Sequence, residues 1–289
     1  MKADGFLPRL VLVTLAAILV VLVWRGVPLL ELALREPAGE PRVVVPRGDL
    51  AADEQTTIAI FEGAKDSVVS ITTESRVVDF WTRNAYDVPR GSGSGFIWDA
   101  QGHVVTNNHV IQDADEINVI LQDDTNLKAE LVGRDTKTDL ALLRVKTDKK
   151  LTAVTFGNSD DMRVGDWVLA IGNPFGLGGT VTAGIISARA RDINAGPYDD
   201  FLQTDASINR GNSGGPLFNM AGEVIGVNTA IASVTGSAGQ EGGSIGLGFA
   251  IPINQARMIG DQLIREGRAT YPVIGASVSA DADGVVRLS

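Results

Sequence analysis

Short apolar runs separated by turn residues fill most of the chain, from about residue 68 to about residue 255. Examples are residues 68–71, 93–98, 117–121, 167–171 and 223–227. These runs are four to six residues long and rich in valine and isoleucine, and no long helical repeat interrupts them. The pattern predicts an all-β domain in this region.

The N-terminus has a different pattern. Residues 10–24 are apolar except for one threonine, and this run lies between Arg9 and Arg25. Flanking apolar residues and snorkelling arginines extend it toward the about 20 residues that span a bilayer. The residues that follow offer no Ala-x-Ala-like cleavage site. We therefore expect an uncleaved signal anchor, a transmembrane helix within residues 1–30, with Lys2 on the cytoplasmic side. A cleaved signal peptide is the rival interpretation.

A flexible linker and two further predicted helices complete the pattern. Residues 31–54 are rich in proline, glutamate, arginine and glycine, which is typical of a flexible linker. Residues 58–65 predict a short helix. Residues 253–266 predict an amphipathic helix that ends at Gly267, because one of its faces carries Ile259, Leu263 and Ile264.

Composition excludes several classes of function. The formal net charge is −10 and no basic stripe offsets it, so nucleic acid is not an expected partner. The chain has no cysteine, which excludes disulfides, thiolate metal sites and cysteine nucleophiles. The glycine-rich residues 91–95 and 176–179 lack phosphate-loop and dinucleotide-binding spacing and are expected to be flexible turns. No cluster of histidines and acids suggests a metal, so we expect no cofactor.

Residues 211–216, Gly-Asn-Ser-Gly-Gly-Pro, carry the clearest chemical signal. Glycine adopts backbone angles that other residues avoid, so consecutive N–H groups can point into one small space. Such a space can stabilise the negative charge on a carbonyl oxygen under attack. A serine hydroxyl is a poor nucleophile without a base, so Ser213 requires a histidine and an orienting carboxylate elsewhere in the chain.

Only two histidines are available as the base. His103 follows a predicted hairpin turn and is expected to be a half-exposed strand residue. His109 ends a β-rich run, a position that also suits an ordinary polar residue. Among the 35 acidic residues, Asp139 directly precedes the apolar run 140–145. A partly desolvated carboxylate there needs a partner such as an imidazole N–H, although Asp139 could also be a strand-start cap.

Taken together, these residues fit a known arrangement. The order His109, Asp139, Ser213 is that of the chymotrypsin-type triad. Three ordered blocks resemble the signature blocks of the HtrA/Deg serine proteases: residues 106–110, 138–143 and 203–217. Shorter matches lie at residues 170–174, 224–230 and 248–252, and the resemblance covers about residues 55–275.

The resemblance implies a chymotrypsin/trypsin-like double β-barrel over residues 55–270, divided near residues 150–165. His109 and Asp139 would come from the first barrel and Ser213 from the second, with the site between them. Residues 271–276 resemble the first strand of the PDZ domain that usually follows in this family. We therefore expect residues 271–289 to begin a truncated PDZ domain.

The resemblance also implies roles for individual residues. His109 would take the proton of Ser213 and Asp139 would fix the imidazole tautomer. The N–H groups of Gly211 and Ser213 would form an oxyanion hole, with Asn212 shaping the turn. Substrate would contact Ile208 and pair with the strand Asn228, Thr229, Ala230 and Ile231.

Regulation and assembly follow from the same resemblance. Asn209 and Arg210 would form a switch before the serine, and residues 187–198 a sensing loop with Arg191 as its relay. Homotrimers are implied, with a contact near residues 55–62 that includes Phe61.

The expected function is a serine endopeptidase at the bacterial inner membrane, with its protease domain in the periplasm. It would cleave unfolded, misfolded or regulatory proteins in the cell envelope, for quality control or stress response. Regulated cleavage of one membrane protein is a narrower possibility. The alternative is a chaperone-like or regulatory binder that rests in an inactive protease conformation.

Overall fold

A computed structural model describes residues 6–34, 48–78, 83–174, 178–209, 211–229, 244, 246–271, 278–280 and 286–288. The chain divides into two compact units, Met1–Asp49 and Leu50–Ser289. The first unit contains helix α1 (Phe6–Leu34), which ends four residues beyond the boundary expected at residue 30. Its segment Pro8–Val27 has a mean hydropathy of 2.5, so it is long and apolar enough to cross a membrane.

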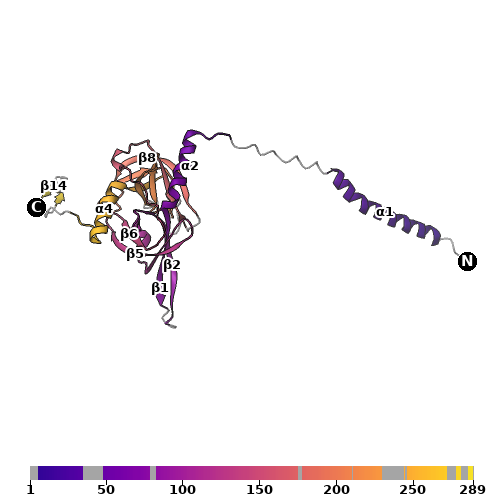
Figure 1. The fold of residues 1–289 in the computed structure, drawn as a ribbon. Coiled ribbons are helices and arrows are strands. Elements are labelled where there is room, and N and C mark those ends of the chain that lie inside the picture. Colours follow the sequence, from indigo (N-terminus) through magenta and orange to yellow (C-terminus); the bar gives the residue numbers. More distant parts are fainter. Residues whose placement is uncertain are drawn as a thin grey trace. The chain divides into compact units, whose positions relative to one another are not determined.

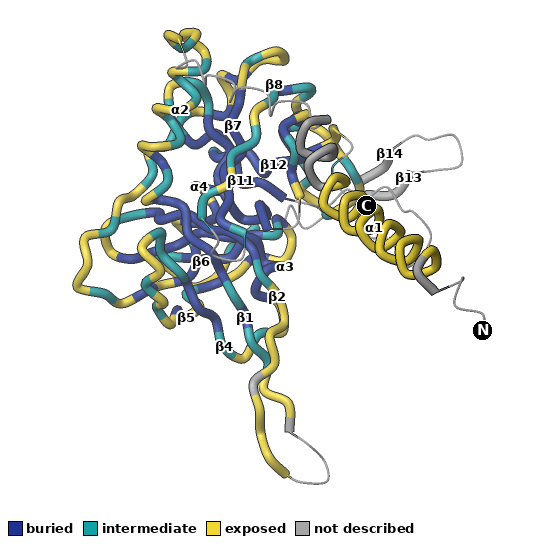
Figure 2. Tube along the Cα trace, turned by 90° about the vertical axis from the view of Figure 1, so that its right-hand side faces the viewer, coloured by how far each residue is buried: buried dark blue, intermediate teal, exposed yellow. Residues whose placement is uncertain are grey.

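The second unit begins with helix α2 (Ala52–Ala64) and a short 3-10 turn, η1 (Lys65–Ser67). Strands then close into a first antiparallel barrel in the order β1-β2-β3-β6-β5-β4. Their bounds are β1 Val68–Val78, β2 Ala85–Ile97, β3 His103–Asn107, β4 Glu116–Ile120, β5 Asn126–Asp135 and β6 Leu140–Val145. The outer part of the β1–β2 hairpin projects from this barrel and is exposed, whereas buried positions gather in the barrel strands (Figure 2).

A second closed barrel follows in the order β10-β11-β12-β9-β8-β7. Figure 1 labels β5 and β6 of the first barrel and β8 of the second. Its strands are β7 Trp167–Gly172, β8 Thr180–Arg191, β9 Phe201–Thr204, β10 Pro216–Asn219, β11 Val224–Thr229 and β12 Gly248–Pro252. The two barrels confirm the predicted fold, and the 3-10 turn η2 (Ser159–Asp161) lies in the connection where we expected the division.

One apolar core joins the barrels. It includes Phe96 and Leu142 from the first barrel and Leu169 and Val227 from the second, each 3% exposed or less. Burying a side chain of this kind contributes about 1.5–3 kcal/mol. The contact therefore fixes the two barrels against each other.

Helix α4 (Ile253–Glu266) has the predicted bounds and contacts strands of both barrels. Gly267, with φ of 71°, ends the helix, and its N–H donates to the Leu263 carbonyl as in a left-handed cap. The short strands β13 (Val278–Ala280) and β14 (Val286–Leu288) pair with each other. They lie in the segment expected to begin a PDZ domain, which remains a prediction.

Candidate active site

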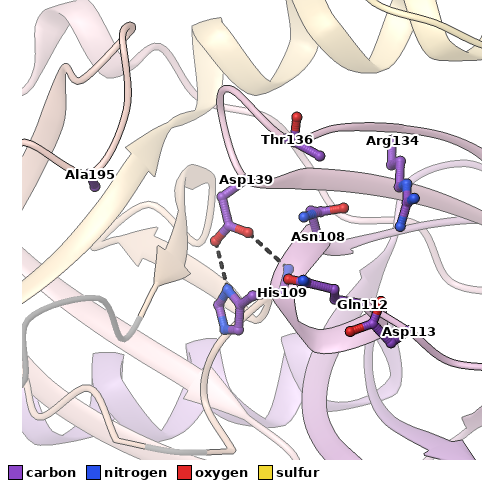
Figure 3. A pocket seen from close by; sticks show the side chains of 8 residues that line it. All are labelled: Asn108, His109, Gln112, Asp113, Arg134, Thr136, Asp139 and Ala195. Atoms are coloured by element: carbon purple, nitrogen blue, oxygen red, sulfur yellow. Dashed lines mark hydrogen bonds and ion pairs between the residues drawn. The ribbon is translucent and has the colours of Figure 1, made fainter.

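His109 and Asp139 lie together at one end of the first barrel. His109 is in the short helix α3 (Asn108–Ile111), which follows β3 directly, and Asp139 ends the turn between β5 and β6. The Asp139 Oδ2 lies 2.7 Å from His109 Nδ1, and Oδ1 accepts the His109 backbone N–H at 2.9 Å (Figure 3). Because one carboxylate holds both groups, the ring has a fixed orientation with a proton on Nδ1 and Nε2 left as the basic nitrogen.

Both barrels position this carboxylate. The Asp139 carbonyl accepts the Asn108 N–H at 2.9 Å and the Asn107 amide at 3.1 Å. From β11 of the second barrel, the Thr229 hydroxyl lies 3.3 Å from Asp139 Oδ2. The Asp139 side chain is 19% exposed and that of His109 is 40% exposed. The acid is thus shielded while the imidazole remains open to a ligand.

The Ser213 loop is a tight turn that requires glycine. Gly211 has φ of 103° and Gly214 has φ of 84°. A Cβ on Gly214 would lie 2.3 Å from the Ser94 carbonyl oxygen, and one on Gly211 would lie 2.4 Å from Pro174 Cβ. Side chains are excluded at both positions, and Ser213 itself is 4% exposed.

Ser94 of β2 fastens this loop to the first barrel, a role that sequence reasoning missed. Its backbone N–H donates to the Ser213 carbonyl at 2.8 Å, and its hydroxyl donates to the Gly211 carbonyl. The same hydroxyl accepts the Asn173 N–H at 2.8 Å. We expected residues 91–95 to form a flexible turn, but they belong to β2, because the barrel needs small residues where the serine loop approaches.

The expected contact between Ser213 and His109 is not formed in the described part of the chain. Within the described residues, no hydrogen bond joins the Ser213 hydroxyl to His109, and the N–H groups of Gly211 and Ser213 donate to no acceptor. Such contacts are often long in unliganded enzymes and shorten when substrate binds. Their expected role as an oxyanion hole stays a prediction.

A hollow of about 600 Å³ opens beside the His109–Asp139 pair. Seven of its eight lining residues are of polar types, and Ala195, from a loop of the second barrel, completes its wall (Figure 3). The lining residues are Asn108, His109, Gln112, Asp113, Arg134, Thr136, Asp139 and Ala195. Among the described residues, no group of three or more acids and histidines could hold a metal ion.

Residues 93–227 match the trypsin-like peptidase domain family. The HtrA-type protease AlgW, solved with a decapeptide, is 42% identical and superposes with a TM-score of 0.68, covering 76% of this chain and 71% of AlgW. The chain belongs to the HtrA-type proteases.

Curated relatives agree with this membership in the HtrA-type family. The periplasmic serine endoprotease DegP-like protein of Rhizobium meliloti (strain 1021) is 54% identical over 190 residues, which cover 66% of this chain and 36% of that protein. Protease Do-like 1 of Arabidopsis thaliana chloroplasts is 46% identical over 237 residues, covering 80% of this chain and 53% of the relative. The chain therefore spans about a third to a half of these relatives.

One residue of this HtrA-type chain differs from its predicted surroundings. His103 is 8% exposed instead of half-exposed, because its Nδ1 pairs with Asp99 Oδ2 at 2.7 Å. Asn228 holds the serine loop, since its backbone N–H donates to Gly215 and its carbonyl accepts from Gly214, both at 2.8 Å. Its expected contact with substrate stays a prediction.

The other predicted substrate residues are only partly described. Ile208 is 6% exposed and packs in the core of the second barrel. Thr229 directs its hydroxyl to Asp139. Ala230 and Ile231 lie outside the described residues.

The predicted regulatory residues that the structure describes make separate contacts, and their relay stays a prediction. The Asn209 Oδ1 accepts the Ser244 N–H at 2.7 Å, and Arg210 lies outside the described residues. Arg191 donates through Nε to Gln203 at 2.9 Å. Because β8 runs to Arg191, the expected sensing loop begins at residue 192 and not at residue 187. Phe61 packs against Gly179 and is partly buried.

Proposed function

We propose that this chain is a serine endopeptidase with Ser213 as its nucleophile. One observation supports the proposal most strongly: both barrels hold the His109–Asp139 pair. The serine loop is bonded to the first barrel, which also carries that pair. The arrangement supplies an oriented base, and the loop supplies two N–H groups without acceptors among the described residues.

In the proposed reaction, His109 Nε2 removes the Ser213 proton as Oγ attacks a peptide carbonyl. Asp139 stabilises the imidazolium that forms and keeps the proton on Nδ1. The N–H groups of Gly211 and Ser213 stabilise the oxyanion, with Asn212 shaping the turn between them. His109 then gives its proton to the leaving amine, and water repeats the sequence to release the acyl group from Ser213.

The proposed substrates are extended segments of unfolded, misfolded or regulatory proteins. The AlgW structures with a tripeptide and with a decapeptide support a peptide ligand. An extended chain suits a site between two barrels, since exposed strand edges pair with a peptide backbone.

We place this activity on the periplasmic side of the bacterial inner membrane. The name of the Rhizobium relative supports the compartment, and the apolar segment Pro8–Val27 supports a single-pass anchor. A cleaved signal sequence has the same composition and remains the rival interpretation. A homotrimer is part of the proposal on family resemblance.

The alternative function is a binder that rests inactive. One observation favours it: no hydrogen bond joins Ser213 and His109 within the described part of the chain. An enzyme that closes this link only with substrate has the same appearance.

Casein cleavage by the full chain tests the proposal. Wild type should cleave, Ser213→Ala should lose essentially all cleavage, and Ser75→Ala on the β1–β2 hairpin should cleave as wild type. Cleavage retained by Ser213→Ala refutes the assignment. If wild type cleaves no casein but suppresses protein aggregation, the result supports the binder.

A further inference from the structure

Tyr271, which follows helix α4, contacts the turn that carries the catalytic acid. Its hydroxyl donates to Asp135 Oδ2, across 136 residues of sequence. Asp135 is the last residue of β5 and is 7% exposed. The same oxygen accepts the Thr138 backbone N–H at 3.1 Å and the Thr138 hydroxyl at 2.5 Å. One carboxylate therefore joins Tyr271 to the residue immediately before Asp139.

The geometry of this turn determines where Asp139 points. Asp139 has φ of 57°, a left-handed conformation that is uncommon outside glycine and that aspartate adopts in tight turns such as this one. The Asp135 carboxylate holds the start of the turn, and the Asn108 N–H holds its end at the Asp139 carbonyl. A shift in the turn therefore moves the Asp139 carboxylate relative to His109.

Aromatic packing keeps Tyr271 in place. Its ring stacks on Tyr198, with centroids 4.2 Å apart and planes 14° apart. The Lys137 ammonium lies 4.6 Å from the Tyr271 centroid and 5.7 Å from that of Tyr198. Gln255 of α4 donates to the Tyr198 carbonyl at 3.2 Å. The cluster thus joins α4, the loop before β9 and the β5–β6 turn.

We propose that Tyr271 is a positioning residue for the catalytic acid: through Asp135 it holds the turn that orients Asp139 toward His109. The inference rests on the proposed function for the catalytic role of Asp139, but the contact itself can be tested without turnover. Burial and the Asp135 carboxylate both raise the pKa of the Tyr271 hydroxyl, so it stays a hydrogen-bond donor throughout the neutral range.

The two histidines allow a direct test. Each has Nδ1 at 2.7 Å from an aspartate, His109 with Asp139 and His103 with Asp99. A ring N–H bonded to a carboxylate gives a low-field proton resonance, so His103 is an internal reference. The signals are recorded in full-length Ser213→Ala protein, with and without Tyr271→Phe, and are assigned with His103→Gln.

In Tyr271→Phe, the His109 signal should shift or broaden while the His103 signal stays unchanged. Tyr198→Phe removes the other hydroxyl of the stack, which does not contact Asp135, and should leave both signals unchanged. Asp135→Asn should reproduce the effect of Tyr271→Phe, and the double variant should add little because both act on one contact. An unchanged His109 signal in Tyr271→Phe, or an equal change in Tyr198→Phe, overturns the inference.

Kinetics supply the second readout. With Ser213 intact, Tyr271→Phe should lower kcat about tenfold with little change in KM, since a small misplacement of a catalytic group is costly. An unaltered kcat overturns the positioning role. If wild type cleaves nothing, the proposed function fails, whereas the resonance experiment still decides whether Tyr271 positions Asp139.

Discussion

Replacing Asp139 by asparagine tests the triad with almost no change in shape. The Asp139 carboxylate accepts two hydrogen bonds from one residue, the His109 backbone N–H and His109 Nδ1–H. An asparagine side chain has one accepting end. If its oxygen faces Nδ1, its NH₂ group faces the His109 backbone N–H, which leaves donors opposed at a cost of about 1–3 kcal/mol. If its NH₂ group faces Nδ1, the ring proton must move to Nε2, and the base toward Ser213 is lost.

The second arrangement should prevail because it keeps both hydrogen bonds. Losing the correct tautomer costs about 10⁴-fold in kcat, or about 5.5 kcal/mol of transition-state stabilisation. The assay is steady-state cleavage of a fluorogenic peptide derived from casein, with folding checked by circular dichroism. The matched control is Asp99→Asn, since Asp99 also accepts the backbone N–H and Nδ1 of its histidine, at 3.2 and 2.7 Å.

Asp99→Asn should keep wild-type kcat, because its histidine lies outside the site. Near-wild-type activity in Asp139→Asn would refute the reasoning. So would equal losses in the two variants, because the effect would then come from the pairing motif in general and not from the catalytic position.

Three further predictions concern the loop, pH dependence and the N-terminal helix. Gly214→Ala should lower the free energy of unfolding by about 3 kcal/mol, from a positive φ and a clash with the Ser94 carbonyl. Gly222→Ala, with a positive φ of 75° but only an ordinary contact to Ile60 at 3.9 Å, should cost about 1 kcal/mol in urea unfolding. Burial and the Asp135 carboxylate raise the pKa of Tyr271 above its ordinary value of 10.0, so folding favours the protonated form. That stability is present below about pH 10 and is lost as the pH rises further; unfolding midpoints should therefore fall more steeply above about pH 10 in wild type than in Tyr271→Phe. Helix α1 should keep the full chain in the membrane fraction after a carbonate wash, and release of the intact chain would contradict an anchor.

The sequence pattern predicted the helices and strands that depend mainly on neighbouring residues. Helix α4 has its predicted bounds, because one apolar face and the glycine that follows it are both visible in the sequence. The strand after Asp139 was equally clear, since five of the six residues 140–145 are apolar. The connection between the barrels also lies where turn residues replaced the apolar runs.

Contacts between distant residues could not be predicted in the same way. Nothing beside His103 indicated that Asp99 would pair with it and bury it. Ser94 lay among glycines and was assigned to a turn, although it meets Gly211 across 117 residues of sequence. Tyr271 reaches Asp135 only after both barrels and α4 have packed. Such contacts depend on three-dimensional proximity, which spacing along one chain does not record.

The most direct test of the central claim is covalent labelling of the full chain with a fluorophosphonate, mapped by peptide mass spectrometry. The account predicts one adduct, on Ser213, whose rate of formation falls sharply in His109→Gln and is unchanged in His103→Gln. Casein cleavage without an adduct on Ser213, or an adduct on another serine, would contradict it.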